Sequence, residues 1–267
     1  MKALLRTARA ILEELKDSIK IAPSFPLRHL AAIQHKEFEF TIGGGAKCFI
    51  RPQTSDAETI RQVFRDKEYD LSRFPQWPSI QSRYRTLLDT GRKPVIIDAG
   101  ANIGAASLWF SMQFPDAIIF AVEPDPHNAR QCRRNTAAIL NITVFECAVG
   151  ATDGRVALSN PDNEAWAVQT SRLDNDGEGI AIRTLASLLD AVPDGELFIA
   201  KIDIEGFEAD LFSENCDWAR TATVIYIEPH DWMPTTRRSS LNFQLALAPF
   251  GKEILISGEN LVYVNST

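Results

Sequence analysis

Short apolar runs alternate with amphipathic stretches through the second part of the chain. Residues 95–97 are three apolar residues in a row, as expected of a strand buried on both faces. Similar runs predict strands at 118–122, 142–147, 197–202 and 223–227. Helices are predicted at 105–110, 128–140, 184–189, 208–212 and 239–247. This alternation predicts an α/β fold with a mainly parallel sheet and helices on both faces. Runs at 252–257 and 261–265 predict a closing antiparallel hairpin.

The first part of the chain has a different pattern. Residues 2–20 predict an amphipathic helix whose apolar stripe is Leu4, Ala8, Ile11, Leu12, Leu15 and Ile19. The polar face carries Glu13, Glu14 and Asp17 beside its lysines, which favours packing on its own domain or on a second copy over a membrane surface. A homo-oligomer formed through this helix is therefore an open expectation.

A hairpin is predicted at 37–41 and 46–50, and helices at 55–65 and 79–91. The region 155–170 is expected to be irregular or short-stranded. We expect two domains: an extension, residues 1–93, that caps the site, and a main domain, residues 94–267.

Charge is distributed unevenly along the chain. The whole carries 28 lysines and arginines against 35 acids, a net charge of −7, which argues against a nucleic-acid partner. Residues 1–93 hold 17 lysines and arginines and 11 acids, whereas residues 94–267 hold 11 lysines and arginines and 24 acids. The basic part is either an ordinary solvated surface with some attraction for the acidic domain, or a cap that receives an anionic substrate.

Cysteine usage and hydropathy indicate the compartment. The four cysteines show no CxxC spacing, so we expect no zinc site and no disulfide framework. No apolar run is long enough to span a membrane, and the N-terminus does not have the pattern of a signal peptide. These features predict a cytoplasmic protein without stable membrane insertion.

A turn of small residues follows the strand at 95–97. Asp98 ends the strand, and Gly100, Ala101, Asn102 and Gly104 lead into a helix. Such a turn lets backbone approach a nucleotide-like ligand closely. Because Asp98 would repel a pyrophosphate, the turn favours a cofactor with a positive centre and no phosphate, such as S-adenosylmethionine.

Further residues end the successive strands. Parallel strands present their carboxyl ends at one edge, where ligands bind. Glu123, followed by Pro124, can accept from both ribose hydroxyls of an adenosine. Cys147 and Ala148 would border the adenine.

The runs KIDIEGFE (201–208) and EPHDW (228–232) gather acids, a lysine and a histidine at neighbouring strand ends. One interpretation is structural, with Lys201 neutralising one of the buried acids, and the other is functional. Asp203 is expected to face the cofactor and substrate, and His230 with the carboxylates can form a general-base site. The same groups can bind a divalent metal, although no repeated ligand spacing requires one.

The ordered motifs resemble the FkbM family of S-adenosylmethionine-dependent methyltransferases. The resemblance rests on DAGANIG (98–104), EPDPHN (123–128) with Asn135, CAVG (147–150), KIDIEGFE and the Glu-x-His ending at His230, with RPQTSD (51–56) and EYD (68–70) upstream. It implies the Rossmann-like class I methyltransferase fold and methylation of a hydroxyl of a sugar or secondary metabolite.

The resemblance also implies a chemistry. The acceptor oxygen would attack the sulfonium methyl in line and leave S-adenosylhomocysteine. His230 is the first candidate for the base, Asp203 and Glu205 are the alternatives, and no metal is expected. The acceptor itself is not identified, although Trp77, Trp166 and Trp232 are candidates for stacking on a ring.

Two other functions compete with methyl transfer. An NAD-dependent oxidoreductase would need G-x-G-x-x-G, but Asn102 and Ala105 stand at the second and third glycine positions. A non-catalytic cofactor-binding or scaffold protein is the other alternative, and the acids at every strand end argue against it.

Overall fold

The computed structural model describes residues 2–43, 45–159, 169–173, 178–232 and 238–265 of the 267-residue chain. The chain divides into two compact units, Met1–Glu68 and Tyr69–Thr267. Contacts place residues 69–93, which the sequence analysis grouped with the extension, in the second unit.

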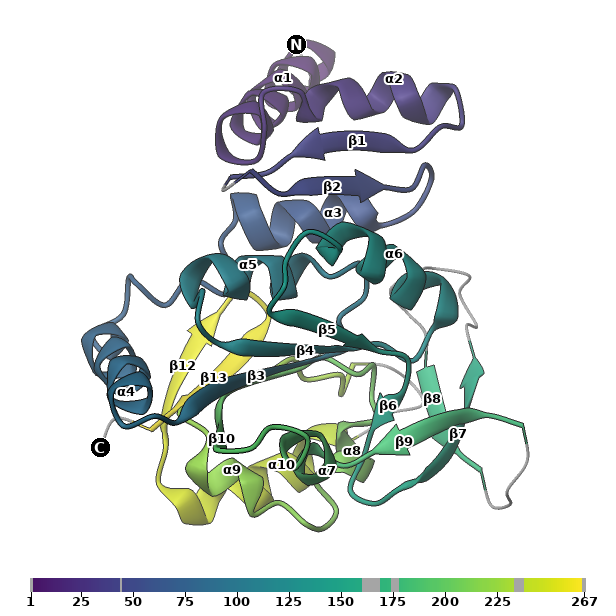
Figure 1. The fold of residues 1–267 in the computed structure, drawn as a ribbon. Coiled ribbons are helices and arrows are strands. Elements are labelled where there is room, and N and C mark those ends of the chain that lie inside the picture. Colours follow the sequence, from purple (N-terminus) through teal and green to yellow (C-terminus); the bar gives the residue numbers. More distant parts are fainter. Residues whose placement is uncertain (1, 44, 160–168, 174–177, 233–237, 266–267) are drawn as a thin grey trace. The chain divides into compact units, whose positions relative to one another are not determined.

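A seven-stranded sheet forms the centre of the second unit (Figure 1). Its strands run in the order β12-β13-β11-β10-β3-β4-β5. From β11 to β5 all neighbours are parallel, whereas β13 is antiparallel to both β11 and β12. The predicted α/β fold with a closing antiparallel hairpin is confirmed. The bounds are β3 (Lys93–Ala99), β4 (Ile118–Val122), β5 (Ile142–Phe145), β10 (Gly195–Ile202), β11 (Val224–Ile227), β12 (Glu253–Ser257) and β13 (Asn260–Val264).

Helices cover both faces of this sheet, with α5 and α6 on one face and α7 to α10 on the other (Figure 1). Every residue of β11, and all of β3 after Lys93, is buried, because a parallel strand between two helical layers has no solvent face. The bounds are α4 (Trp77–Asp89), α5 (Ala105–Gln113), α6 (Pro126–Thr136), α7 (Leu185–Leu189), α8 (Glu208–Leu211), α9 (Trp218–Thr221), α10 (Ser239–Leu247) and the 3-10 turn η3 (Ala248–Phe250).

A second, four-stranded sheet stands beside the first and was not predicted as a sheet. Its order is β6-β9-β7-β8, with bounds β6 (Ala148–Val149), β7 (Gly154–Ser159), β8 (Gln169–Arg172) and β9 (Ile180–Arg183). Val156 and Ile182 of this sheet are buried against Phe207, which follows β10 in the chain. The small sheet therefore packs on the loop that carries the KIDIEGFE acids.

The first unit contains helices and one hairpin. The predicted hairpin is confirmed: β1 and β2 pair antiparallel with Phe38 opposite Ile50. The predicted first helix is also present. The bounds are α1 (Lys2–Lys20), η1 (Phe25–Leu27), α2 (Arg28–Ile33), β1 (Phe38–Thr41), β2 (Lys47–Ile50), α3 (Asp56–Ile60) and the π-helical turn η2 (Arg61–Arg65).

The orientation of α1 differs from the expectation. Ile11, Leu12, Leu15 and Ile19 of the predicted stripe are exposed, so the alternative that they pack on their own domain is wrong, whereas packing on a second copy stays a prediction. Leu4 and Ala8 lie outside the residues whose side chains are described. The acids of the helix face inward and pair with arginines of the same unit. Among the described residues, we find no helix with the length and apolar character required to cross a bilayer.

Candidate cofactor and catalytic site

The strand order brings the predicted strand-end residues to one edge of the large sheet. Asp98 is the penultimate residue of β3, and Glu123 directly follows β4. Asp203 follows β10, and Glu228 follows β11. Because β11, β10, β3 and β4 are consecutive parallel neighbours, these four acids line the carboxyl edge, where open α/β sheets bind their ligands.

The glycine-containing turn after β3 is fixed by its packing. Gly100 has φ +78°, and a Cβ there would lie 1.7 Å from the carbonyl oxygen of Asp203. Gly104 has φ +84°, and a Cβ there would meet the Cys132 Sγ of α6 at 2.9 Å. Both positions therefore require glycine for the turn to pack against β10 and α6. Whether the same backbone also approaches a cofactor stays a prediction.

Glu123 joins this turn to the end of β4. Its Oε2 accepts the Asn102 N–H at 2.7 Å, and its Oε1 accepts the Asp125 N–H at 2.9 Å. Burial raises the pKa of Glu123 to about 7, although these two N–H groups oppose the rise. A carboxylate oxygen has two lone pairs, so each oxygen retains one for a ligand hydroxyl. Glu123 can therefore still accept the predicted hydrogen bonds from the ribose hydroxyls.

Asp98 and Lys201 form a buried polar core under the turn. Asp98 Oδ2 accepts the Ser107 hydroxyl at 2.6 Å, and its Oδ1 lies 3.4 Å from Lys201 Nζ. Lys201 donates to the Gly100 carbonyl at 2.7 Å and lies 3.2 Å from Asp203 Oδ2. Burial alone would lower the pKa of Lys201, but the charges of Asp203 and Asp98 raise it well above its usual value. Lys201 therefore neutralises two strand-end acids and holds the turn in place.

His230 is the centre of an acidic cluster. Its Nδ1 lies 3.0 Å from Glu208 Oε1, and both side chains are almost fully buried. Its Nε2 faces Asp203, Glu205 and Glu228, whose nearest oxygens are 3.7, 3.6 and 3.6 Å away. The structure thus brings together the three predicted catalytic residues, His230, Asp203 and Glu205. Those distances exceed hydrogen-bond length, so these three side chains interact with Nε2 electrostatically and not by a hydrogen bond.

Three groups of the cluster have raised pKa values. Burial disfavours the imidazolium, but the hydrogen bond with Glu208 and the nearby carboxylates raise the pKa of His230 to about 9. Burial and the charge of Asp203 raise the pKa of Glu205 to about 8 and of Glu228 to about 9. An added positive charge would therefore be favourable here.

Glu208 was not predicted as a site residue. It begins α8, is fully buried, and its Oε1 also accepts the Ile204 N–H at 3.2 Å. One signal was present in the sequence, because Glu208 is the last acid of KIDIEGFE. Its position predicted only the start of a helix. Its partner His230 lies 22 residues later, beyond another strand.

A metal could be held by part of this cluster. One ligand atom each from Asp203, Glu228 and His230 lies within 4.8 Å of the others. Carboxylate oxygens and an imidazole nitrogen suit a divalent cation. The alternative of a metal therefore stays open beside that of a base.

The predicted aromatic residues fall in different places. Trp232 is 66% exposed, with its ring centroid 6.4 Å from that of His230. Trp77 packs against Phe114 at 6.0 Å, which makes it part of the fold. Trp166 lies outside the described residues.

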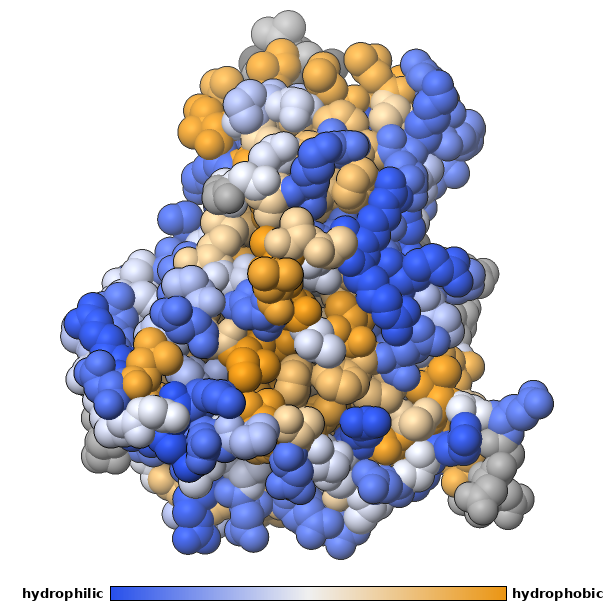
Figure 2. Space-filling model, in the orientation of Figure 1, coloured by the Kyte–Doolittle hydropathy of each residue, from blue (hydrophilic) through white to orange (hydrophobic). Residues whose placement is uncertain are grey.

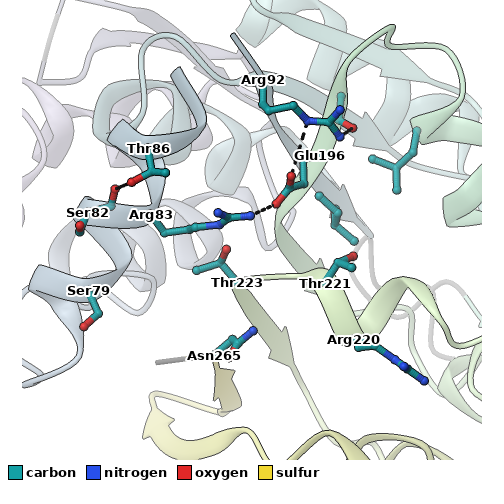
Figure 3. A pocket seen from close by; sticks show the side chains of 13 residues that line it. Ser79, Ser82, Arg83, Thr86, Arg92, Glu196, Arg220, Thr221, Thr223 and Asn265 are labelled. Atoms are coloured by element: carbon teal, nitrogen blue, oxygen red, sulfur yellow. Dashed lines mark hydrogen bonds and ion pairs between the residues drawn. The ribbon is translucent and has the colours of Figure 1, made fainter. Parts of the chain in front are cut away.

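A cavity of about 850 Å³ lies at the opposite edge of the sheet (Figure 3). Its lining includes Gly195, which begins β10, and Thr223, which precedes β11. Arg83 and Arg92 point into it, but both pair with Glu196 (Figure 3). The cavity is thus at the amino ends of the strands and contains none of the predicted site residues.

A parallel sheet with this strand order, an antiparallel closing hairpin and acids at the ends of its first strands defines a class I methyltransferase domain. The chain belongs to the methyltransferase FkbM domain family, whose family model matches residues 98–251. The cofactor of this family is S-adenosylmethionine, as predicted. Membership sets aside the NAD-dependent alternative.

Individual relatives match parts of the chain. The 2-O-methyltransferase NoeI of Sinorhizobium fredii is 38% identical over 27% of this chain and 30% of its own. Methyltransferase 1 of Beauveria bassiana is 24% identical over 57% of this chain and 64% of its own. The chain therefore spans less than two thirds of either relative. Among solved structures, a precorrin-6y C5,15-methyltransferase from Geobacter metallireducens aligns with a TM-score of 0.37 and 15% identity, over 65% of this chain and 79% of its own.

Proposed function

We propose that this protein transfers the methyl group of S-adenosylmethionine to a hydroxyl oxygen of a small molecule, such as a sugar or a secondary metabolite. The observation that carries the proposal is the orientation of His230. Glu208 fixes Nδ1, so Nε2 faces the carboxyl edge of the sheet among Asp203, Glu205 and Glu228. A fixed imidazole at the ligand-binding edge suits proton removal from an acceptor.

The cofactor would lie along the same edge. We assign its binding to Asp98, Gly100, Ala101, Asn102, Gly104, Glu123, Pro124, Cys147, Ala148 and Asp203. Glu123 would accept from the ribose hydroxyls, and the buried Cys147 and Ala148 would border the adenine. Asp98 would act through the turn that it and Lys201 hold. The excess of carboxylates favours a cation such as a sulfonium with a free amino group.

When bound, S-adenosylmethionine supplies an electrophilic methyl carbon on a positive sulfur. The chain has to hold the acceptor oxygen in line with the carbon–sulfur bond, which accounts for much of the rate in such reactions. The acceptor proton then passes to Nε2 of His230, with Asp203 and Glu205 as the alternative bases. Glu208 stabilises the resulting imidazolium through Nδ1–H.

The raised pKa of His230 sets the expected pH dependence. Only the neutral imidazole can accept a proton, and the pKa of about 9 means that it is mostly protonated at pH 7. Turnover should therefore rise as the pH rises from 7 towards 9. A bound sulfonium disfavours the imidazolium, so the apparent pKa of turnover should lie below about 9.

The name of one relative supports oxygen as the atom that accepts the methyl group. The Sinorhizobium fredii relative is named a 2-O-methyltransferase, although the match covers 27% of this chain. An O-methylated product would agree with that name.

The test is transfer of labelled methyl from S-adenosylmethionine to a panel of neutral and anionic sugars and phenols, with the product site found by mass spectrometry and NMR. His230→Ala and His230→Gln should lower turnover about 10²–10⁴-fold with cofactor affinity nearly unchanged. The exposed His127→Ala is the matched control and should retain activity. Full turnover in both His230 variants would remove His230 as the base, and methylation only on nitrogen or carbon would overturn O-methylation.

A further inference from the structure

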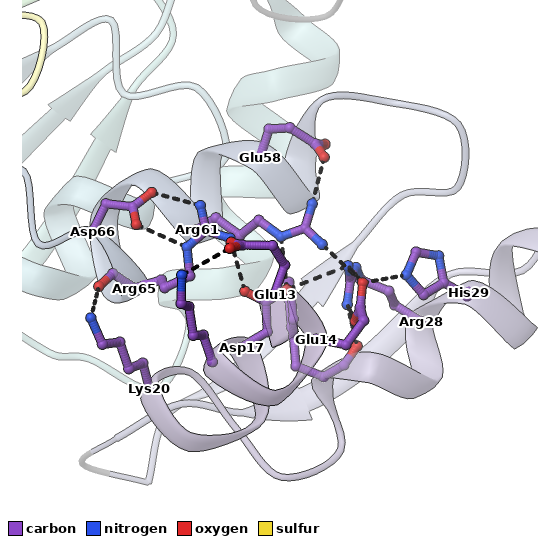
Figure 4. A network of polar contacts seen from close by, with 12 residues as sticks. Glu13, Glu14, Asp17, Lys20, Arg28, His29, Glu58, Arg61, Arg65 and Asp66 are labelled. Carbon is purple, nitrogen blue, oxygen red and sulfur yellow. Dashed lines mark hydrogen bonds and ion pairs between the residues drawn. The ribbon is translucent and has the colours of Figure 1, made fainter. Parts of the chain in front are cut away.

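The acidic side chains of helix α1 form ion pairs inside the first unit. Asp17 is fully buried, and its carboxylate lies 2.8 Å from Arg61 Nε and 3.2 Å from Arg65 Nη1 (Figure 4). The Glu14 carboxylate accepts a hydrogen bond from each terminal nitrogen of Arg28, both at 2.9 Å. Glu13 pairs with Lys16 and Arg65. The polar face of the helix therefore serves as its inner, packed face.

The opposite face of α1 is left apolar and basic. Ile11, Leu12, Leu15 and Ile19 are between 51% and 76% exposed. Arg9, Lys16 and Lys20 are also exposed, at spacings of seven and four residues, which places them in one row beside the apolar stripe. Lys16 pairs with Glu13 at 2.8 Å, and Lys20 Nζ donates to the neutral Arg65 carbonyl, so Arg9 and Lys20 supply the net positive charge of the row. From Arg9 to Lys20, every acid is at least partly buried and paired.

The neighbouring helix continues this character. Leu27, Leu30 and Ile33 are between 54% and 76% exposed, and α2 contains no acid. Arg28 ties α2 to α1 through Glu14. Figure 2 shows hydrophobic side chains on the surface over α1 and α2. We call these seven exposed apolar side chains, together with Arg9, Lys16 and Lys20, the outer face of the first unit.

We propose that the outer face binds the surface of an anionic lipid membrane. An apolar stripe beside a row of basic side chains is complementary to acyl chains beneath anionic headgroups. Glu13, Glu14 and Asp17 argued against this partner in the sequence, but all three acids form ion pairs inside the unit. The proposal concerns attachment in the plane of the interface and is independent of the methyl transfer.

Charge argues for this partner over a second copy of the chain. A symmetric dimer presents the same patch from both sides, so two basic rows are brought into one interface, where their positive charges repel. Of the acids of α1 that could offset this repulsion, Glu14 and Asp17 already pair with arginines of the unit. Glu13 already pairs with Lys16 and Arg65. An anionic surface meets the basic row without that repulsion.

The test is sedimentation of the full chain with vesicles of phosphatidylcholine alone and of phosphatidylcholine with phosphatidylserine. We expect binding to the phosphatidylserine vesicles, weakened by salt because the basic contribution is screened. Leu15→Ser with Ile19→Ser should reduce binding about tenfold or more, since both side chains supply apolar contact. Arg9→Gln should reduce it on anionic vesicles only.

The matched control is Leu245→Ser, an exposed leucine on α10 of the other unit, at 66% exposure. It should bind vesicles like the parent, and thermal unfolding checks that every variant is folded. Equal binding to both vesicle types, or none to either, overturns the proposal. So does light scattering that shows a dimer which Leu15→Ser with Ile19→Ser dissociates while vesicle binding stays absent; that result assigns the face to a second copy.

Discussion

Glu208 is the residue whose importance emerges only from the fold. Residues 22 apart in the chain, Glu208 and His230, meet as a buried carboxylate–imidazole pair with a hydrogen bond of 3.0 Å. The sequence predicted His230, Asp203 and Glu205 because they stand at strand ends in a suggestive motif. It did not predict Glu208, because a glutamate at the start of a helix is ordinarily explained by the helix itself.

Glu208→Gln tests whether Glu208 orients the His230 imidazole and raises its pKa. The amide can still accept from Nδ1–H but carries no negative charge, so the imidazolium loses its stabilisation and the pKa of His230 falls. The pH profile of turnover should move about one unit lower or more, and the maximal rate should drop about tenfold. Steady-state rates from pH 6 to pH 10 measure both effects.

The exposed Glu214→Gln is the control for Glu208→Gln, since it removes a charge nearby in sequence without touching the pair. A purely structural role for Glu208 predicts lower stability with an unmoved pH profile. That result would remove Glu208 as a positioning residue.

At the scale of elements, the sequence predicted the main sheet and its hairpin because apolar runs report burial directly. The residues of β4 and α10 agree with the predicted bounds. The small sheet was missed because β7 and β8 are partly exposed, so they lack a continuous apolar run. The direction of α1 was also missed. Periodicity reveals that a helix has two faces, but the arginines that bind the acidic face lie up to 52 residues away from their partners.

The turn between β3 and α5 offers a prediction about packing. Gly100→Ala has to adopt φ near +78° and also place a methyl group 1.7 Å from the Asp203 carbonyl oxygen. Since backbone on the neighbouring loop must move, the variant should lose about 3 kcal/mol or more of unfolding free energy. Urea unfolding of the purified protein measures the loss.

Gly251→Ala is a control for this prediction within the same unit. Gly251 has φ +62°, and a Cβ added there would meet nothing within 4 Å, so only the backbone cost of about 1–2 kcal/mol applies. Equal losses in the two variants would show that contact between the turn and the β10 loop contributes little.

At the scale of the whole molecule, the division into units changes the meaning of the charge asymmetry. The first unit, Met1–Glu68, holds 12 lysines and arginines against 9 acids, a net charge of +3. Residues 69–93 hold 5 against 2, which is another +3, but they belong to the second unit. The basic excess assigned to one cap is therefore shared equally between the two units. The expectation that residues 1–93 cap the site stays a prediction.

Salt dependence tests whether this basic excess receives an anionic acceptor. Screening lengths fall from about 30 Å at 0.01 M to about 8 Å at 0.15 M salt, so attraction by basic side chains away from the reacting atoms is lost over that range. For an anionic acceptor, kcat/KM should fall about tenfold, whereas a neutral acceptor of similar size should change little. The ratio of the two values cancels any effect of salt on the cofactor, because both assays use the same one. A ratio that stays constant with salt would assign the basic residues to other roles. For those on the outer face of the first unit, the vesicle experiment tests whether that role is membrane binding.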